Sequence, residues 1–339
     1  MKRGLMAAAA VLAVAALGYA ALWFHGASRM KQAVADWKQE AESNGLTITY
    51  AELEVGGFPF ELSTVVRDFS LRNEAEGARI EAAPIRLRTT LWDPNRVAYE
   101  FTGRHSVTVE QGLRRVQTTV EVGAGTGEVL LVERGRHDRV KATDLRFIGK
   151  DGIVTIASFE GSGTTLPKQA DPAAETMHST YALTGIEFSS RLGVKLIEPP
   201  IERVRVEMAA TGPFLELFED GTLVDWAEAG GAVTLRDLSI EWNGLSLAAT
   251  GSGRFDSELR PSGSVTLVSP GFEESLRELE ASGVLPYQFG DLVRAMTEPF
   301  IVPGANGGKS QLIIPVTAEN GLLSIGGEPM GRVPSLKEL

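Results

Sequence analysis

The sequence contains no cysteine, which excludes disulfides, thiolate nucleophiles and every metal site that depends on cysteine ligands. Histidine is scarce too: His25, His105, His137 and His178 are the full set, and no two of them have the i, i+4 spacing of a zinc-binding helix. Phosphate-binding loops, dinucleotide fingerprints and nucleophile elbows are also missing from the sequence. We therefore expect neither a metal nor a cofactor, and we assign no catalytic residue.

Basic residues are fewer than acidic residues in this chain. The chain has 33 lysines and arginines against 44 aspartates and glutamates, which gives a formal net charge of −11. Lys2 and Arg3 are the only charged residues among the first 24, so residues 25–339 carry −13. Such a surface repels a phosphate backbone, which argues against a nucleic-acid partner, and it repels anionic lipid headgroups as well. Any lipid contact beyond an N-terminal anchor is expected to be apolar.

One long uncharged stretch follows these two cations. Leu5 to Phe24 comprises 20 residues without a charge. As a helix with a rise of about 1.5 Å per residue, it is long enough for a hydrocarbon core of roughly 30 Å. Cations before an apolar span favour a cytoplasmic N-terminus, so residues 25–339 are expected in the periplasm. The sequence thus predicts a single-pass inner-membrane protein with its anchor in residues 1–24.

A cleaved signal peptide is the alternative interpretation of this stretch, because Gly18-Tyr19-Ala20 offers small residues where a signal peptidase cuts. We favour a retained anchor. The apolar run exceeds the roughly 7–15 residues of a signal core, and Trp23 suits a membrane interface. Both interpretations export residues 25–339.

Residues 25–45 are predicted to form a connecting helix. Met30, Val34, Trp37 and Ala41 recur at spacings of four, three and four, which places them on one stripe of the helix. Asn44-Gly45 then provides a left-handed stop. The helix is expected to lead from the bilayer to the exported domain.

From Leu46 onward apolar residues recur at every second position, which is the pattern of half-buried antiparallel strands. With 43% apolar residues, the chain can bury one large core or two ordinary ones. We predict roughly a dozen strands or more, separated by glycine-rich breaks at Gly123–Gly127 and Gly161–Gly163. The alternating sets are Leu46, Ile48 and Tyr50; Phe58, Phe60, Leu62, Thr64 and Val66; Ile85, Leu87, Thr89 and Leu91; Val97, Tyr99 and Phe101; Val116, Thr118, Val120 and Val122; Ile153, Thr155, Ala157 and Phe159; Val204, Val206 and Met208; and Leu238, Ile240 and Trp242.

Two hairpins are predicted from their turns. Asn320-Gly321 separates two apolar runs, and both residues tolerate the positive φ that a short hairpin requires. Pro315 in the first of these runs indicates an edge strand or a bulge, because proline cannot donate to the ladder. The second hairpin runs from Gly253 to Val268 and turns near Pro261.

The predicted fold class is mainly β (α+β): a large curved antiparallel sheet or two related β units, with a few packing helices. Helices are expected over residues 214–229, split at Gly221, over residues 272–282, and around Phe289 to Met296 before Pro299. Residues 46–339 form the β-rich domain. If it consists of two halves, they meet near residues 166–200, where Leu166–Pro172 and Glu198–Pro200 are expected to be loops.

The motif Gly56-Gly57-Phe58-Pro59-Phe60 combines two permissive glycines with a proline and two aromatic residues. Phe58 and Phe60 are two apart, so in a strand they share one side. As structure, the motif is a turn that feeds a strand whose aromatic residues anchor the core. As function, it places these rings at the mouth of an apolar groove. The candidate groove or core residues are Phe58, Phe60, Leu62, Trp242, Leu245 and Leu247.

The acidic pairs Glu273-Glu274 and Glu219-Asp220 are typical of solvated helix faces and helix ends. A glycosidase would need two such carboxylates on either side of a sugar bond, and nothing in the local sequence favours this.

These features together resemble domain-of-unknown-function family 2125, an uncharacterised group of bacterial envelope proteins. The resemblance is carried by the anchor, the helix with Trp37, the Gly56–Phe60 motif, Trp242–Leu245 leading into Gly251–Gly253, and the closing hairpin over 312–327. It covers nearly the whole exported region and brings no known catalytic residue. A looser similarity is to AsmA-like envelope proteins, in which curved sheets with an apolar inner face are associated with lipid transport; this is an analogy of architecture.

The leading hypothesis is a non-enzymatic, membrane-anchored periplasmic protein that binds or shields lipid-like apolar ligands in envelope maintenance. An interaction or scaffold module of an envelope assembly, with a filled core and protein partners, is the second hypothesis. A hydrolase of envelope glycans or lipids is the third, and it requires His105, His137 or His178 to cluster with acids in space. An open apolar trough and an ordinary sandwich core give the same alternation, so the sequence leaves this choice open.

Overall fold

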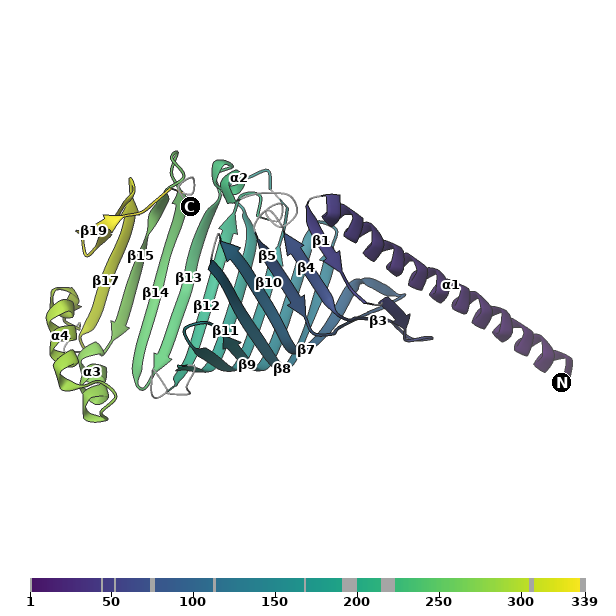
Figure 1. The fold of residues 1–339 in the computed structure, drawn as a ribbon, viewed down its shortest axis with the longest axis horizontal. Coiled ribbons are helices and arrows are strands. Elements are labelled where there is room, and N and C mark those ends of the chain that lie inside the picture. Colours follow the sequence, from purple (N-terminus) through teal and green to yellow (C-terminus); the bar gives the residue numbers. More distant parts are fainter. Residues whose placement is uncertain are drawn as a thin grey trace. The chain divides into compact units, whose positions relative to one another are not determined.

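The computed structural model describes residues 2–43, 45–51, 53–73, 77–111, 114–167, 169–190, 200–214, 223–304 and 308–335. It confirms a mainly β protein, with 19 strands in one antiparallel sheet and a few helices (Figure 1). Among these residues, the helices are α1 (Lys2–Ser43), α2 (Leu223–Glu228), α3 (Phe272–Ala281), α4 (Tyr287–Thr297) and the 3-10 helix η2 (Glu298–Phe300). The strands are β1 (Leu46–Thr49), β2 (Leu53–Gly56), β3 (Leu62–Val66), β4 (Phe69–Asn73), β5 (Ala78–Ala82), β6 (Ile85–Thr90), β7 (Asp93–Gln111), β8 (Arg114–Val132), β9 (Gly135–Ile148), β10 (Ile153–Thr165), β11 (Glu175–Ser189), β12 (Ile201–Thr211), β13 (Ala232–Trp242), β14 (Leu245–Phe255), β15 (Pro261–Pro270), β16 (Ile301–Val302), β17 (Gln311–Glu319), β18 (Leu322–Ile325) and β19 (Glu328–Arg332).

The chain divides into two compact units. The first comprises residues 1–130 and 144–151, and the second comprises residues 131–143 and 152–339. Strand β9 therefore contributes to both. That two related β halves meet near residues 166–200 stays a prediction; part of that region, residues 168 and 191–199, lies outside the described residues.

Helix α1 joins the expected anchor and the expected connecting helix into one continuous helix. Its end is as predicted, because Gly45 has a φ of 80° and its N–H donates to the carbonyl of Glu42 at 3.2 Å. The side chains of residues 1–16 lie outside the described residues, so most of the predicted Leu5–Phe24 span is not described at that level. Within the described part of the chain, no helix meets the length and apolarity needed to cross a membrane.

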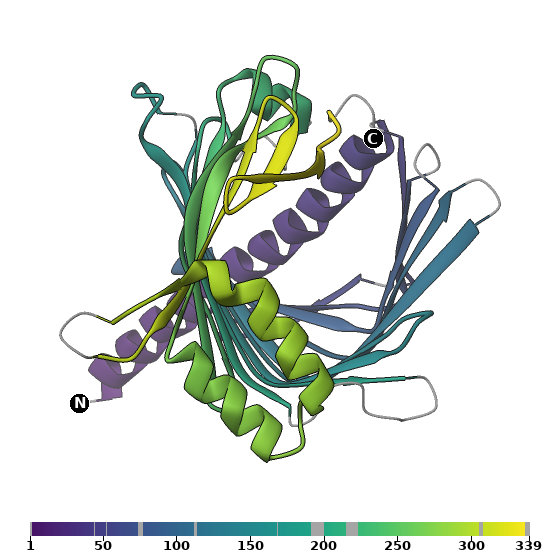
Figure 2. The same cartoon turned by 90° about the vertical axis from the view of Figure 1, so that its left-hand side faces the viewer.

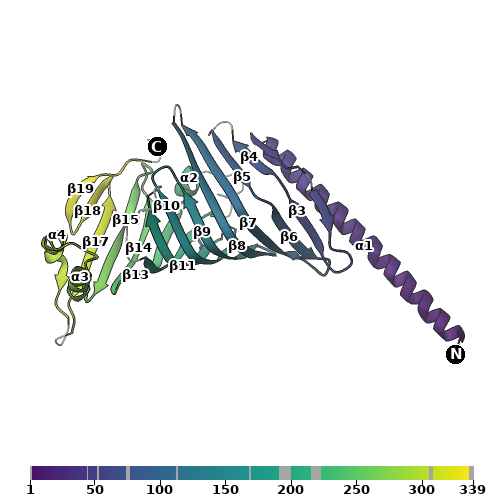
Figure 3. The same ribbon diagram turned by 60° about the horizontal axis from the view of Figure 1, so that its bottom comes forward.

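The first unit is built around strand β7. One edge of β7 pairs with β6 over residues 93–101 and with β5 over residues 106–109, and the other edge pairs with β8. Strand β3 lies between β2 and β6, and α1 passes the ends of β3 and β6 (Figure 3). Trp23 and Ala27 of α1 are buried with Leu62 of β3, and Met30, Val55 and Leu91 pack around them. This small core joins the helix to the sheet.

The predicted glycine breaks at 123–127 and 161–163 are wrong, because these residues lie inside the long strands β8 and β10. Gly125 and Gly127 pair directly with Phe101 and Tyr99 across the ladder. A Cβ on Gly127 would lie 2.1 Å from the Tyr99 ring, and one on Gly125 would lie 2.4 Å from the Phe101 ring. These glycines leave room for cross-strand rings instead of ending a strand.

The second unit is a meander of long strands. Each strand from β10 to β15 pairs with the next, β17 follows β15, and β18 and β19 complete the series. Helices α3 and α4 lie together beside the end of these strands (Figure 2). Phe272 and Leu276 of α3 are buried against Leu312 of β17. The predicted helices at 272–282 and before Pro299 are thereby confirmed.

The two predicted hairpins are also confirmed. Glu319 pairs with Leu322 around Asn320 and Gly321, whose φ values are 52° and 73°. Strand β14 pairs with β15 up to Phe255 and Pro261. Strand β17 is not an edge, however, because it lies between β15 and β18.

Pro315 has a different explanation from an edge strand. It pairs with Thr266 on β15, and on the other side of β17 it falls between the residues that pair with β16 and those that pair with β18. On that side Pro315 has no paired residue in β16 or β18, so no ladder hydrogen bond described there needs its missing N–H. Of the helix predicted over 214–229, the structure describes only α2, since residues 215–222, which include Glu219, Asp220 and Gly221, lie outside the described residues.

Candidate functional site

An apolar cavity of about 420 Å³ lies on one face of the second unit. Ligand pockets are typically about 300–1,000 Å³, mostly apolar and concave, so its size and chemistry suit a small ligand. The side chains that make it apolar are Trp226, Val233, Leu235, Phe255, Pro261, Val265, Val316, Ala318 and Leu323. They come from α2 and from β13, β14, β15, β17 and β18.

The strand register explains why these side chains converge. Leu235, Gly251, Val265 and Val316 are successive partners across four strands. Two residues along, Val233, Gly253, Gly263, Ala318 and Leu323 form a second row. Directly paired residues share a face, and so do residues two apart in a strand. Both rows therefore line one surface. Its centre is recessed because Gly251, Gly253 and Gly263 have no side chains to fill it.

Trp226 of α2 forms one wall of the cavity. Its side chain is buried at 4% exposure, and its Nε1–H donates to the carbonyl of Thr211 at 3.0 Å. The Phe255 ring stands edge-on to the indole with the centroids 6.4 Å apart. A buried indole needs such an N–H partner, so Trp226 is fixed in place while its apolar body faces the cavity.

The opposite face of the same strands is polar. Ser252, Ser264 and Thr317 are successive partners, one residue along from the apolar rows. Together with Arg254 and Glu319 they line a separate, polar hollow. This part of the sheet therefore has one polar face and one apolar face, and the described residues do not cover the apolar face completely.

The loop between β14 and β15 connects two residues that line the cavity, Phe255 and Pro261. The carboxylate of Asp256 accepts hydrogen bonds from the N–H groups of Glu258 and Arg260 at 2.9 and 3.0 Å. It also accepts one from Nε of Arg260 at 2.9 Å. The backbone bond from Arg260, supported by its guanidinium and by the N–H of Glu258, holds the pKa of Asp256 below its ordinary value.

This lowered pKa predicts a pH-dependent stability. A depressed carboxyl pKa stabilises the fold above the unfolded-state value of 3.8, and the contribution is lost as the pH falls through the lower folded-state pKa. Asp256→Ala should therefore lower the urea midpoint at pH 7, and the gap from wild type should narrow below about pH 4. Asp256→Asn is the control that keeps an acceptor but removes the charge. An equal gap at pH 3 and pH 7 would contradict this role of the carboxylate.

The predicted motif lies elsewhere, in the first unit. Phe58, Pro59 and Phe60 form a turn between β2 and β3 rather than part of a strand, because the N–H groups of Phe60 and Glu61 both donate to the carbonyl of Gly57. The rings do not anchor a core: Phe58 is 54% and Phe60 is 74% exposed. Leu62 does belong to a core, beside Trp23. The hollow next to Gly56 and Gly57 is lined by charged residues such as Lys31, Glu61 and Arg86 and is not an apolar groove.

The other predicted residues lie near the turn between β13 and β14. Trp242 pairs with Leu245, and Ile240 pairs with Leu247. Leu245 packs against the buried cluster of α3 and β17, and Ser275 of α3 donates to the carbonyl of Gly244 at 3.0 Å. The structure therefore places Leu245 in the core beneath α3. The residues of the cavity were not predicted; their sequence signal is Gly251 and Gly253, alternate small residues inside an apolar strand.

The histidines show one cluster with acids. His178 Nε2 lies 3.6 Å from a carboxylate oxygen of Glu207, and Arg236 lies 3.1 Å from its Nδ1 and also pairs with Glu175. These groups are partly exposed, and Arg236 pairs with both Glu175 and Glu207, as in a surface ion-pair network. His137 contacts Thr164, and burial lowers the pKa of His105. Among the described residues, no group of three potential ligands is placed to hold a metal ion.

The fold and the cavity define a single-sheet, mainly β protein with an apolar hollow in its second unit. The comparison with family models matches residues 23–334 to the family described as "Uncharacterized protein conserved in bacteria (DUF2125)". The chain belongs to that family, as its motifs indicated. The search of curated proteins and the search of solved structures each gave no match.

Proposed function

We propose that this protein is a non-enzymatic, membrane-anchored periplasmic protein that binds lipid-like apolar ligands in the cavity of its second unit. The observation that carries the proposal is the pair of apolar rows on β13, β14, β15, β17 and β18, with a glycine floor and a fixed Trp226 wall. A chain of about ten methylene groups would gain about 8 kcal/mol on full burial there, before the entropy cost of binding is subtracted. No charged contact is needed for such binding.

The localisation is part of the proposal. The uncharged run from Leu5 to Phe24 is proposed as a retained anchor in the inner membrane, with the sheet curving in the periplasm to shield its ligand. N-terminal sequencing of the protein from washed membranes tests the anchor. A chain that begins at its original N-terminus supports the anchor, whereas a chain that begins near Ala21 would show signal-peptide cleavage.

Filling the cavity should abolish ligand binding. In Ala318→Phe the new ring enters the hollow between Gly263 and Leu323, where it competes with an acyl chain for the same volume. The expected result is at least a tenfold rise, equivalent to about 1.4 kcal/mol, in the Kd of a fluorescent long-chain fatty acid. Lipid extracted from the purified protein and detected by mass spectrometry should fall in parallel.

Thr317→Phe is the matched control, since it adds the same ring one residue away on the exposed polar face. It should leave the Kd within about twofold of wild type, a change below about 0.5 kcal/mol. Equal loss in both variants would contradict the cavity as the binding site. Ligand-free wild type with reproducible crosslinks to other proteins would favour the scaffold hypothesis. Hydrolytic activity that His178→Ala removes would favour an enzyme.

A further inference from the structure

The turn Gly56–Phe60 is fastened to α1 at the end of its apolar run. Tyr19 donates its hydroxyl to the carbonyl of Pro59. One helical turn later, Trp23 Nε1–H donates to the carbonyl of Glu61 at 2.8 Å. The Phe58 ring lies edge-on to Trp23 at 5.5 Å and stacked with Phe24 at 6.2 Å between centroids. The turn therefore sits alongside residues 19–24 of the helix.

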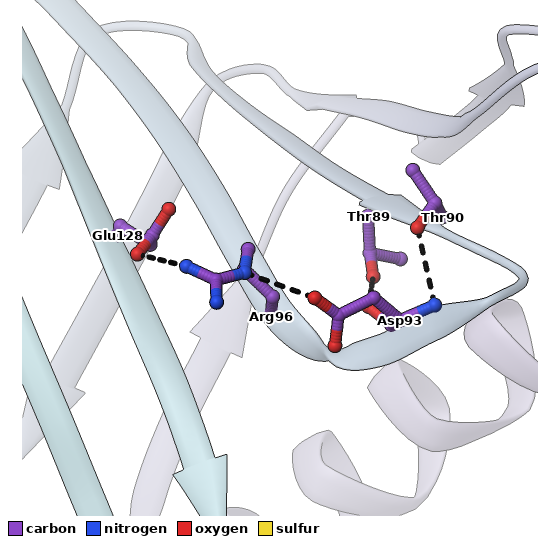
Figure 4. A network of polar contacts seen from close by, with 5 residues as sticks. All are labelled: Thr89, Thr90, Asp93, Arg96 and Glu128. Carbon is purple, nitrogen blue, oxygen red and sulfur yellow. Dashed lines mark hydrogen bonds and ion pairs between the residues drawn. The ribbon is translucent and has the colours of Figure 1, made fainter.

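A second turn reaches the same part of α1. Leu91, between β6 and β7, packs into the cluster of Trp23, Ala27 and Leu62, and its neighbour Trp92 is 66% exposed. Two hydrogen bonds hold the turn: the Thr89 hydroxyl donates to the carbonyl of Asp93, and the N–H of Asp93 donates to the hydroxyl of Thr90. Arg96 then links the Asp93 carboxylate to Glu128 (Figure 4). Trp92 is thus presented by a fixed turn rather than by a loose loop.

The exposed rings of these two turns and of the adjoining part of α1 are Phe24, Phe58, Phe60 and Trp92, and they are called the aromatic surface below. Phe24 is 64% exposed, and Leu17 and Leu22 on the helix are exposed as well. The helix carries no aspartate, glutamate, lysine or arginine between Gly4 and Ser28. Exposed apolar and aromatic side chains beside the end of an apolar helix suit a membrane interface, where tryptophans such as Trp92 are enriched.

We propose that the aromatic surface rests in the interfacial layer of the bilayer that holds α1, and so fixes the height and tilt of the first unit on the membrane. This rests on the anchor proposed above and is independent of the ligand cavity. The occupant is a lipid bilayer surface, because the rings lie beside the end of the uncharged run Leu5–Phe24 that is proposed above as the anchor. The contact is apolar, as the net negative charge of the chain requires.

The absence of cysteine allows a clean test with single-cysteine variants of the full chain. Phe60→Cys and Trp92→Cys, labelled with a polarity-sensitive fluorophore, are reconstituted into phosphatidylcholine nanodiscs. We expect blue-shifted emission, protection from aqueous iodide and quenching by lipids that carry a spin label near the headgroup. Leu17→Cys reports on the anchor. Val116→Cys is the water-exposed control. Val116 pairs with Val109 near the end of β7 that lies away from the Trp92 turn. About 16 residues of β7, at roughly 3.3 Å each, separate this position from the turn.

The outcomes separate this proposal from the others. Lipid quenching at positions 60 and 92, but not at 116, supports it. Iodide-accessible labels at 60 and 92, with a lipid-quenched label at 17, would overturn the aromatic surface and leave the anchor intact. Labels at 60 and 92 that are protected from iodide but not quenched by lipid would overturn it in favour of a protein partner. A water-exposed label at 17 would overturn the anchor and this proposal together, while the fatty-acid measurement remains valid.

Discussion

Trp23→Ala is expected to lower the free energy of unfolding of the first unit by about 3–5 kcal/mol, the usual cost of removing a buried large aromatic side chain. Trp23 is only 4% exposed and lies at the centre of the contact between α1 and β3. Its loss leaves a cavity beside Leu62 and removes the indole hydrogen bond to the carbonyl of Glu61. Urea unfolding of the full chain in detergent micelles, followed by the β-sheet signal in circular dichroism, measures the change.

Two controls separate packing from the hydrogen bond. Trp23→Phe keeps a ring in the core but lacks the donor, so it should cost less than the alanine variant, with about 1–3 kcal/mol from the unpaired carbonyl. Leu22→Ala changes the neighbouring side chain, which is 63% exposed, and should stay within about 0.5 kcal/mol of wild type. If Trp23→Ala unfolded like wild type, α1 would not be docked on the sheet as the structure shows.

The sheet could be predicted because its signal is local. Alternation with a period of two identifies a strand whichever partner it takes, and Asn320-Gly321 specifies its hairpin through backbone conformation alone. The glycine breaks failed because the reason for Gly127 lies on another strand, in the Tyr99 ring that covers it. A single sequence without its pairing cannot distinguish a glycine that turns the chain from one that makes room for a neighbour.

The candidate sites also divide into features with a local sequence signal and features that depend on strand pairing. The Gly56–Phe60 motif was correctly singled out as a turn, but its rings were expected inside a core or groove, and the structure leaves Phe60 exposed beside α1. The cavity depends on rows such as Leu235, Gly251 and Val265, which lie on three strands and meet only through the register. Each strand alone looks like an ordinary half-buried strand. The hollow becomes visible only when the small residues of β14 and β15 are placed side by side.

Gly263→Ala is expected to destabilise the second unit by about 1–3 kcal/mol or more, the range of overpacking within a closely packed structure. A Cβ at this position would lie 2.2 Å from the carbonyl oxygen of Ser252 and 2.6 Å from the Cα of Gly253. Both atoms belong to the backbone of the neighbouring strand, so neither can rotate away and the two strands must separate. Since Gly263 forms the floor of the cavity, fatty-acid binding should weaken together with the urea midpoint.

Gly253→Ala is the matched control, because Gly253 is the direct partner of Gly263 in the same ladder and lines the same cavity. The nearest atom to a Cβ there is the carbonyl oxygen of Ser262 at 3.7 Å, which is an ordinary contact. The reduced entropy of the unfolded chain should make this variant neutral or more stable by about 0.4–1 kcal/mol. Similar behaviour of the two alanine variants would show that β14 and β15 do not approach as closely as the structure places them. The opposite responses expected here would show that the close approach of the two backbones, and not the loss of a glycine as such, excludes a side chain at position 263.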